Sequence, residues 1–159
     1  MKTMTILASA SFILTGAIAL LAGRAAAADG LGVWEGTGTA YSVQGATLGT
    51  FAVSLTRSQT GAHVRIDGKA TLANGQEIPF WEEDETEGTT GFRIRASSGS
   101  GHGGCFANEI CQKYTQREDG RAVATTIAVD SADRVRVTET EYDKQQVVQY
   151  REETLKRTQ

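Results

Sequence analysis

Apolar and polar residues alternate along several short segments of this chain, and this period of two constrains its fold most. In the segment 62–72, Val64 and Ile66 share one side, while Arg65 and Asp67 share the other. Such alternation is typical of a β-strand with one buried face. The same period occurs in three further segments, namely 51–55, 91–96 and 134–137. No long stretch has the 3.6-residue period of a helix, so the sequence predicts an all-β protein.

Turn residues separate these segments at intervals of about ten residues, as in other all-β proteins. Asn74-Gly75 and Asp119-Gly120 both favour hairpin turns, because their residues tolerate positive φ. The connections are short, which predicts an antiparallel up-and-down meander of about 8–10 strands. Closing it into a small soluble barrel would hide both sheet edges and bury the apolar face inside. The expected strands lie near residues 32–43, 49–58, 62–72, 76–84, 89–97, 105–116, 121–130, 133–142 and 146–156.

The N-terminal segment, residues 1–28, predicts a signal peptide rather than part of the fold. Lys2 precedes an apolar run from Met4 to about Ala22, and small residues that suit signal peptidase follow it. Cleavage would leave a single barrel domain over residues 29–159. A membrane anchor is the alternative, because the apolar run approaches the length of a membrane span. We expect cleavage, and hence a periplasmic or secreted protein with no membrane span.

The charge of the chain argues against two classes of partner. It carries 16 Lys+Arg and 19 Asp+Glu, a formal net charge of −3, without a basic cluster. Binding to the phosphates of nucleic acid or to an anionic membrane surface needs concentrated lysine and arginine. We therefore expect neither nucleic acid nor an anionic membrane as a partner.

The first expected strand carries the motif Gly32-Val33-Trp34-Glu35-Gly36-Thr37-Gly38. A glycine two residues before a tryptophan on the first strand resembles the calycin superfamily, which includes lipocalin-like and nitrobindin-like barrels. The resemblance implies that Trp34 plugs the closed end of the barrel, with an arginine of the last strand across its ring. Arg157 is the first choice for that arginine and Arg151 the second, since a guanidinium over an indole gains cation–π energy.

The longer pattern G-x-W-x-G-x-G looks closer to the nitrobindins, a family that binds haem through a histidine near the C-terminus. This chain has two histidines, His63 and His102, and neither is near the C-terminus. Haem binding is therefore not carried over, and no cofactor is expected. The resemblance covers one strand and one arginine.

Cys105 and Cys111 predict a disulfide, because two cysteines in an exported chain usually pair. The bond would close a small loop at the rim of the barrel. A zinc or copper site with His102 is the alternative, but no fourth ligand is close in sequence, so we expect no metal. The disulfide would also remove Cys105 as a nucleophile, and the G-x-S-x-G motif of serine esterases is missing. No catalytic residue is assigned.

Two acidic stretches bear on function. Segment 81–88 places several carboxylates in an expected hairpin turn, which predicts a solvated acidic turn that could dock a basic partner. Strict alternation from Val137 carries Glu139 and Glu141 inward, which is costly in an apolar interior. The favoured explanation is a bulge after Thr138 or a solvated barrel mouth; a polar cavity that faces a ligand is the alternative.

Three classes of function remain open. The first is an exported carrier that binds a small apolar or amphipathic molecule inside the barrel. The second is a periplasmic protein-binding module, an inhibitor or accessory subunit, that acts through the disulfide-stapled loop around Phe106. The third and least favoured is a small barrel enzyme that uses Glu139 and Glu141. The residues expected to bind the ligand of a carrier are Trp34, Phe51, Phe92, Ile94, Phe106, Tyr114, Glu139 and Glu141.

Overall fold

The computed structural model describes residues 30–106 and 110–159, and every regular element within them is a β-strand. The predicted all-β class is therefore confirmed, while the predicted signal peptide lies outside the described residues. The described part of the chain contains no helix that is long and apolar enough to cross a membrane. The strands are β1 (Gly32–Ser42), β2 (Thr47–Thr60), β3 (His63–Leu72), β4 (Glu77–Glu87), β5 (Gly91–Ala96), β6 (Gly99–Phe106), β7 (Ile110–Arg117), β8 (Ala122–Ser131), β9 (Arg134–Asp143) and β10 (Gln146–Arg157).

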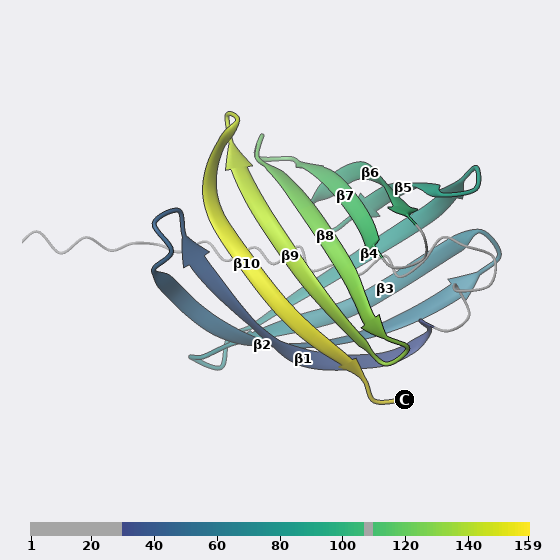
Figure 1. Cartoon of the computed structure of the whole chain (residues 1–159), viewed down its shortest axis with the longest axis horizontal. Helices are drawn as coiled ribbons and strands as arrows, with labels where there is room; N and C mark the ends of the chain where they lie inside the picture. The colour runs from purple at the N-terminus through teal and green to yellow at the C-terminus, as the bar shows by residue number, and fades with distance from the viewer. Residues whose placement is uncertain (1–29, 107–109) are drawn as a thin grey trace, which may run out of the picture.

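The strands form a closed antiparallel barrel, as the alternation and the short connections predict. Each strand pairs with its neighbours in sequence, and β1 also pairs with β10, so the meander has no open edge. The closing pair is long, running from Trp34 opposite Arg157 to Ser42 opposite Gln149. In Figure 1 the strands β8–β10 pass across the front and cross the direction of β2–β4 behind them.

Both predicted hairpin turns are confirmed. Asn74-Gly75 lies between β3 and β4, and Asp119-Gly120 lies between β7 and β8. The two glycines have φ values of 82° and 85°, a region that glycine enters without a steric penalty. These turns fix the register of the strands on either side.

The glycine-rich segment 99–106 is strand β6, although no strand is expected there before Cys105. Its glycines allow close contacts that other residues would block. A Cβ at Gly103 would lie 2.4 Å from the Phe92 ring, and a Cβ at Gly101 would lie 1.9 Å from the Tyr114 carbonyl oxygen. Packing against β5 and β7 therefore outweighs the low strand propensity of glycine.

The barrel encloses one cluster of buried apolar side chains. Trp34 is 1% exposed, and its indole Nε1 donates a hydrogen bond to the Gly30 carbonyl oxygen at 3.0 Å. Each large buried side chain contributes about 1.5–3 kcal/mol, so this cluster supplies most of the stability. Its members are Trp34, Phe51, Val53, Leu55, Val64, Ile66, Ala70, Phe80, Phe92, Ile94, Cys105, Cys111, Ile127, Val135, Val137 and Leu155.

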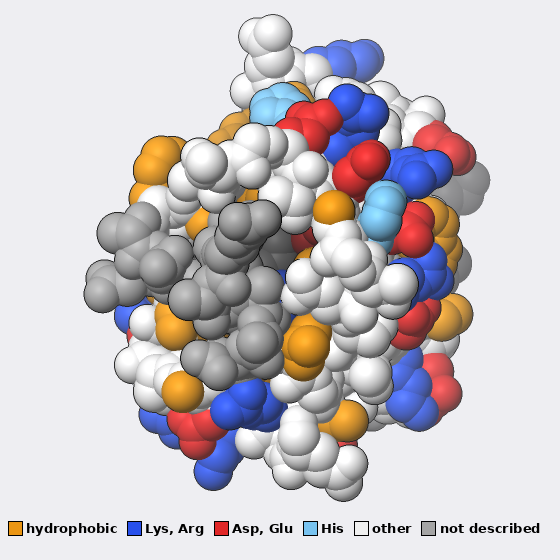
Figure 2. Space-filling model, turned by 90° about the vertical axis from the view of Figure 1, so that its right-hand side faces the viewer, with side chains coloured by type: hydrophobic (Ala, Val, Ile, Leu, Met, Phe, Trp, Pro, Cys, Tyr) orange, Lys and Arg blue, Asp and Glu red, His pale blue; other side chains and the backbone are white. Residues whose placement is uncertain are grey.

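The outer face of β3 and β4 carries ion pairs between exposed side chains. Arg65 lies 2.7 Å from Asp67, and Lys69 lies 2.6 Å from Glu77. The Arg65 guanidinium also lies over the Trp81 ring, 4.7 Å from its centroid. Figure 2 shows basic and acidic side chains side by side along one flank of the molecule. Exposed pairs of this kind contribute little stability, on the order of 0–1 kcal/mol each.

Candidate functional site

Four apolar residues among those expected to bind a ligand point into the barrel. Trp34, Phe51, Phe92 and Ile94 are all buried in the apolar cluster. Arg157 lies directly opposite Trp34 in the β1–β10 register, and its placement across the Trp34 ring stays a prediction. Trp34, Phe51, Phe92 and Ile94 thus belong to the apolar part of the interior.

Phe106 and Tyr114 do not line the interior, and that part of the expectation is wrong. They are 63% and 43% exposed, and each follows a residue whose side chain is buried inside the barrel, Cys105 and Lys113 respectively. Side chains alternate along a strand, so the residue after an inward position points outward. Both aromatic side chains therefore lie on the outer surface of the barrel.

The predicted disulfide is confirmed. Cys105 and Cys111 lie opposite each other on β6 and β7, with an S–S distance of 2.05 Å and a Cα–Cα distance of 4.0 Å. Both residues are buried, so the bond staples the β6–β7 hairpin from inside the barrel. The bond uses both thiols, which leaves neither cysteine as a nucleophile or a metal ligand.

Glu139 and Glu141 point into the barrel without any bulge after Thr138. The register of β9 against β8 runs unbroken from Thr138 to Tyr142, so the expected bulge is wrong. Glu139 Oε2 lies 3.0 Å from Arg151 Nη2, and the Thr125 hydroxyl donates to Glu139 Oε1 at 3.3 Å. The interior of the barrel is therefore polar at this level.

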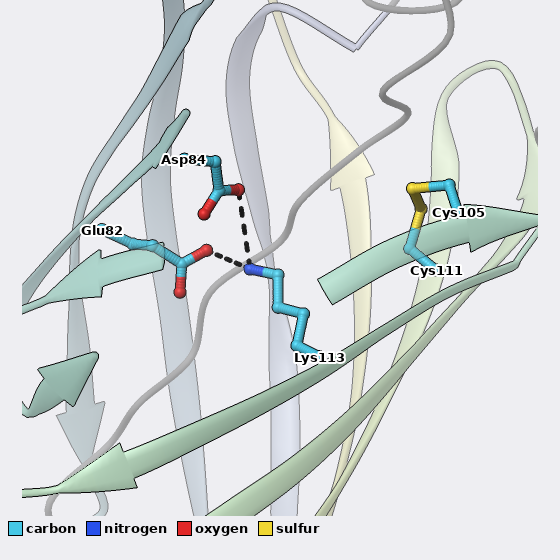
Figure 3. Close-up of a disulfide and its surroundings, with 5 residues drawn as sticks. All are labelled: Glu82, Asp84, Cys105, Cys111 and Lys113. Atoms are coloured by element: carbon cyan, nitrogen blue, oxygen red, sulfur yellow. Dashed lines mark hydrogen bonds and ion pairs between the residues drawn. A yellow bond between two sulfur atoms is a disulfide. The ribbon is translucent and has the colours of Figure 1, made fainter. Parts of the chain in front are cut away.

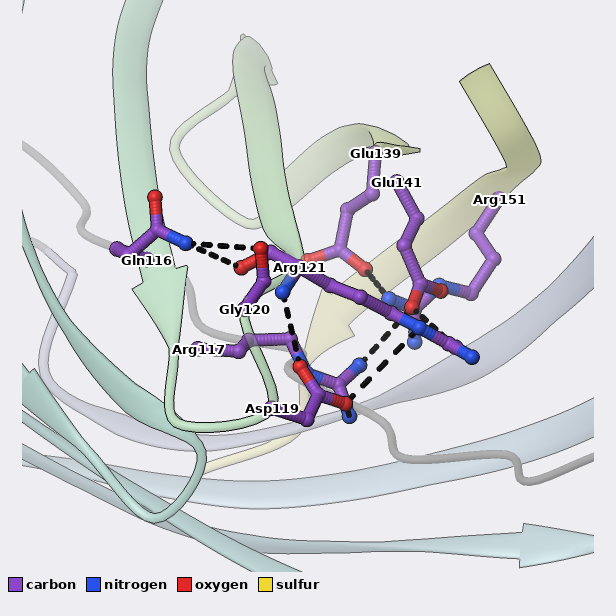
Figure 4. Close-up of polar contacts among 8 residues, drawn as sticks. All are labelled: Gln116, Arg117, Asp119, Gly120, Arg121, Glu139, Glu141 and Arg151. Carbon is purple, nitrogen blue, oxygen red and sulfur yellow. Dashed lines mark hydrogen bonds and ion pairs between the residues drawn. The ribbon is translucent and has the colours of Figure 1, made fainter. Parts of the chain in front are cut away.

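Glu141 belongs to an ion-pair network near the β7–β8 hairpin. Arg117 Nη1 and Arg121 Nη1 both donate to Glu141 Oε1 at 3.1 Å. Arg117 also lies 3.0 Å from Asp119 in the turn itself. Figure 4 shows these side chains converging, with the Glu139–Arg151 pair beside them. Two arginines thus hold the Glu141 carboxylate in ion pairs.

A second charged group joins β4 to β7 across the interior. Lys113 Nζ donates to Glu82 Oε1 and lies 3.9 Å from Asp84 Oδ2. Figure 3 shows the lysine reaching toward both carboxylates, away from the disulfide. All three side chains are buried. The expectation of a wholly solvated turn over 81–88 is therefore wrong, because β4 extends to Glu87 and turns every second acid inward.

Burial changes the proton affinity of several of these acids. It raises the pKa of Glu82 to about 8, helped by the charge of Asp84 and opposed by Lys113. It raises the pKa of Glu153 to about 8 as well, helped by Glu139 and opposed by Arg151. Burial also raises the pKa values of Asp84 and Glu139. Glu82 and Glu153 therefore favour the neutral, protonated form near pH 7.

Several oxygens of this cluster accept no hydrogen bond. Among the described residues, neither Asp84 carboxylate oxygen nor Glu153 Oε1 has a hydrogen-bond partner. A buried polar atom without a partner costs free energy, so such atoms mark places where a ligand or water is expected to bind. We call this group the interior charged cluster; its described members are Arg57, Glu82, Asp84, Lys113, Arg117, Glu139, Glu141, Arg151 and Glu153.

Seven of these nine members are absent from the residues expected to bind a ligand, although the sequence holds a signal for them. Phe80 points inward, so alternation along β4 carries Glu82 and Asp84 inward too. The same parity along β7 carries Lys113 inward from Cys111, and along β10 it carries Glu153 inward from Leu155. Following the parity through charged residues, and not only apolar ones, would have found the cluster.

The comparisons with known proteins show the fold. No family model and no curated sequence matches the chain. An S-type phycobiliprotein lyase from Guillardia theta superposes with a TM-score of 0.68 at 9% identity, covering 84% of this chain and 90% of that one. Rv2717c from M. tuberculosis superposes with a TM-score of 0.61 at 12% identity, covering 81% and 92%. A protein of the DUF3598 family from Nostoc punctiforme superposes with a TM-score of 0.62 at 11% identity. That match covers 83% of this chain and 49% of the other protein. The resemblance to calycin-like barrels predicted from the first strand is thereby confirmed for the fold.

Proposed function

We propose that this protein is an exported carrier that binds one small amphipathic molecule inside its barrel. One observation carries the proposal: the closed barrel holds an apolar cluster and a charged cluster side by side, with carboxylate oxygens that accept no hydrogen bond. A purely structural core gains nothing from buried charges, because desolvating them costs several kcal/mol each, on the order of the stability of a whole domain. An amphipathic ligand uses both parts, since its apolar body packs on one and its polar head meets the other.

The proposed location of the protein follows from its N-terminus and its disulfide. The segment 1–28 has the composition of a signal peptide, and the Cys105–Cys111 bond is of the kind that persists in oxidising compartments. We infer the periplasm or the extracellular space as the place where the carrier works.

A calorimetric titration with n-dodecanol tests the carrier function, since this probe has an apolar chain and an uncharged polar head. We expect one molecule bound per barrel. Ala96 points inward at a half-buried position, so Ala96→Trp fills the interior and should weaken binding at least about tenfold. Arg95 is its exposed neighbour on the outer face, and Arg95→Trp is the matched control that should bind as the parent does. A folded Ala96→Trp variant that binds dodecanol unchanged, or a parent that binds none, would contradict the proposal.

A protein-binding module is the second candidate, and one surface favours it. Phe106, Ile110 and Tyr114 are exposed on the outer side of β6 and β7, next to the disulfide. Exposed apolar side chains on a rigid hairpin suit a protein partner. If this function holds, Phe106→Asp should abolish capture of a specific periplasmic protein while leaving dodecanol binding intact. Capture that is unaffected by Phe106→Asp would exclude this surface.

A further inference from the structure

One buried acid in the described part of the barrel takes part in none of its ion pairs. Among the described residues the interior charged cluster has five acids and four bases. Four of the acids each have a basic nitrogen within 3.9 Å. These ion pairs are Glu82 with Lys113, Asp84 with Lys113, Glu139 with Arg151, and Glu141 with Arg117 and Arg121.

Glu153 is the acid that remains. It is 3% exposed on β10, and its Oε1 accepts no hydrogen bond. No ion pair joins it to a base within residues 30–106 and 110–159, because Arg151 turns its guanidinium to Glu139 at 3.0 Å. Arg151 acts on Glu153 through its charge and not through an ion pair, so the Glu153 carboxylate can still accept a direct contact from a cation.

We propose that the ligand carries a cationic nitrogen, such as a primary ammonium group, and that Glu153 receives it inside the barrel. This inference rests on the proposed carrier function and names the chemistry of the ligand's head group. An ammonium would donate charge-assisted hydrogen bonds to the Glu153 carboxylate. An anionic head would instead meet Glu153 and Glu139 together, which like-charge repulsion disfavours.

The surroundings of Glu153 suit such a head group. A Cβ placed on Gly38 would lie 2.3 Å from the Phe51 ring and 2.9 Å from Glu153 Cγ, so the ring and the acid meet over this glycine. The face of an aromatic ring attracts a cation, which adds to the attraction of the carboxylate. Val137 lies opposite Glu153 on β9 and continues into the apolar cluster, where the body of the ligand would pack.

Binding should also change the protonation of Glu153. Burial and the charge of Glu139 raise the pKa of Glu153 to about 8, and the charge of Arg151 opposes them. The empty protein therefore holds a proton on this acid near pH 7. A cation stabilises the ionised carboxylate, so its binding should release that proton.

Three probes with the same chain and different heads test the inference: n-dodecylammonium, n-dodecanol and n-dodecanoate, titrated by calorimetry below their micelle concentrations. We expect dodecylammonium to bind at least about tenfold more tightly than dodecanol, the difference made by one charge-assisted hydrogen bond. Repeating the titration in two buffers of different ionisation enthalpy should show proton release with dodecylammonium and none with dodecanol.

Glu153→Gln removes the carboxylate and keeps the shape of the side chain. It should abolish both the preference for dodecylammonium and the proton release, while dodecanol still binds and shows that the barrel is intact. Glu152→Gln is the matched control, because Glu152 is the exposed neighbour on the outer face of β10 and should leave the preference unchanged.

The outcomes separate this inference from the carrier function. Equal binding of all three probes, or tightest binding of dodecanoate, would overturn the inference and leave the carrier function standing. A preference for dodecylammonium that survives Glu153→Gln would overturn the role of Glu153. Binding of none of the probes would overturn the carrier function and the inference with it.

Discussion

The inner faces of two groups of strands follow the same alternation but carry opposite kinds of side chain. The inward positions of β1–β3 are aromatic, aliphatic or small, with Arg57 as the exception among the described residues. The inward positions of β7, β9 and β10 include six charged side chains, namely Lys113, Arg117, Glu139, Glu141, Arg151 and Glu153. Alternation thus determines whether a side chain points inward, but not whether an apolar or a charged residue occupies that inward position. The apolar wall stabilises the fold, and the charged wall is where the proposed ligand's head group would bind.

The apolar wall should be most sensitive at Trp34. Trp34→Ala should lower the free energy of unfolding by about 3–5 kcal/mol, because a buried indole is lost and a cavity remains. Urea unfolding followed by circular dichroism measures the change. A loss below about 1 kcal/mol would mean that this side chain contributes no more than a surface residue.

The charged wall should respond in a different way, through broken pairs. Arg151→Ala leaves the buried Glu139 carboxylate without its 3.0 Å partner, which should cost about 3–5 kcal/mol. The double variant Arg151→Met, Glu139→Leu removes both charges and should recover most of that loss in the same urea experiment. A double variant that is less stable than Arg151→Ala would mean that the pair stabilises the barrel, in contrast to the account given above.

Removing the Cys105–Cys111 disulfide should lower the free energy of unfolding by less than either of these changes. The double variant Cys105→Ser, Cys111→Ser should lose about 2 kcal/mol, because the disulfide closes only a short loop and restricts the unfolded chain modestly. Comparison of the urea midpoints of the oxidised parent and the double variant measures it. An unchanged midpoint would show that the hairpin holds without the staple.

The pH dependence of stability should report the buried acids, and Glu153 of the charged wall is one of them. Glu153 has a pKa of about 8 in the folded barrel, against an ordinary value of 4.5. Between these values the folded protein holds a proton that the unfolded chain releases, so stability should fall as the pH rises from about 5 to about 8. Glu153→Gln should make this fall shallower in urea midpoints taken across that range. An identical slope in parent and variant would contradict the raised pKa.

The outer face offers the smallest effect and a baseline for the others. Lys69→Ala removes an exposed ion pair with Glu77, and solvent screens such pairs strongly. We expect a change in unfolding free energy below about 0.5 kcal/mol, measured in the same way. A loss comparable with that of Arg151→Ala would remove the distinction between inner and outer charges.

Much of the fold can be predicted from the sequence, because alternation and hairpin turns act locally. Asn74-Gly75 and Asp119-Gly120 set two hairpins directly. Strand β6 cannot be predicted in this way. Its glycines are required by close contacts with Phe92 and with β7, and these contacts follow only from the pairing of the strands.

The charged cluster is a different case. Parity along each strand determines that Glu82 or Lys113 points inward, so their direction can be predicted from the sequence. Their pairing cannot, because Glu82 and Lys113 meet across the interior from strands that are not neighbours in the sheet. That Glu153 is the buried acid outside the described ion pairs emerges only from the complete set of pairs.

The most direct test of the central claim, that this barrel carries an amphipathic molecule, is the mass of the protein purified from a periplasm. The mass is measured under native and then under denaturing conditions. We expect the native mass to exceed that of the oxidised chain by one small molecule, which leaves on denaturation and whose mass reveals a basic nitrogen. A native protein that has only the mass of the oxidised chain, and that takes up none of the three dodecyl probes, would contradict the claim.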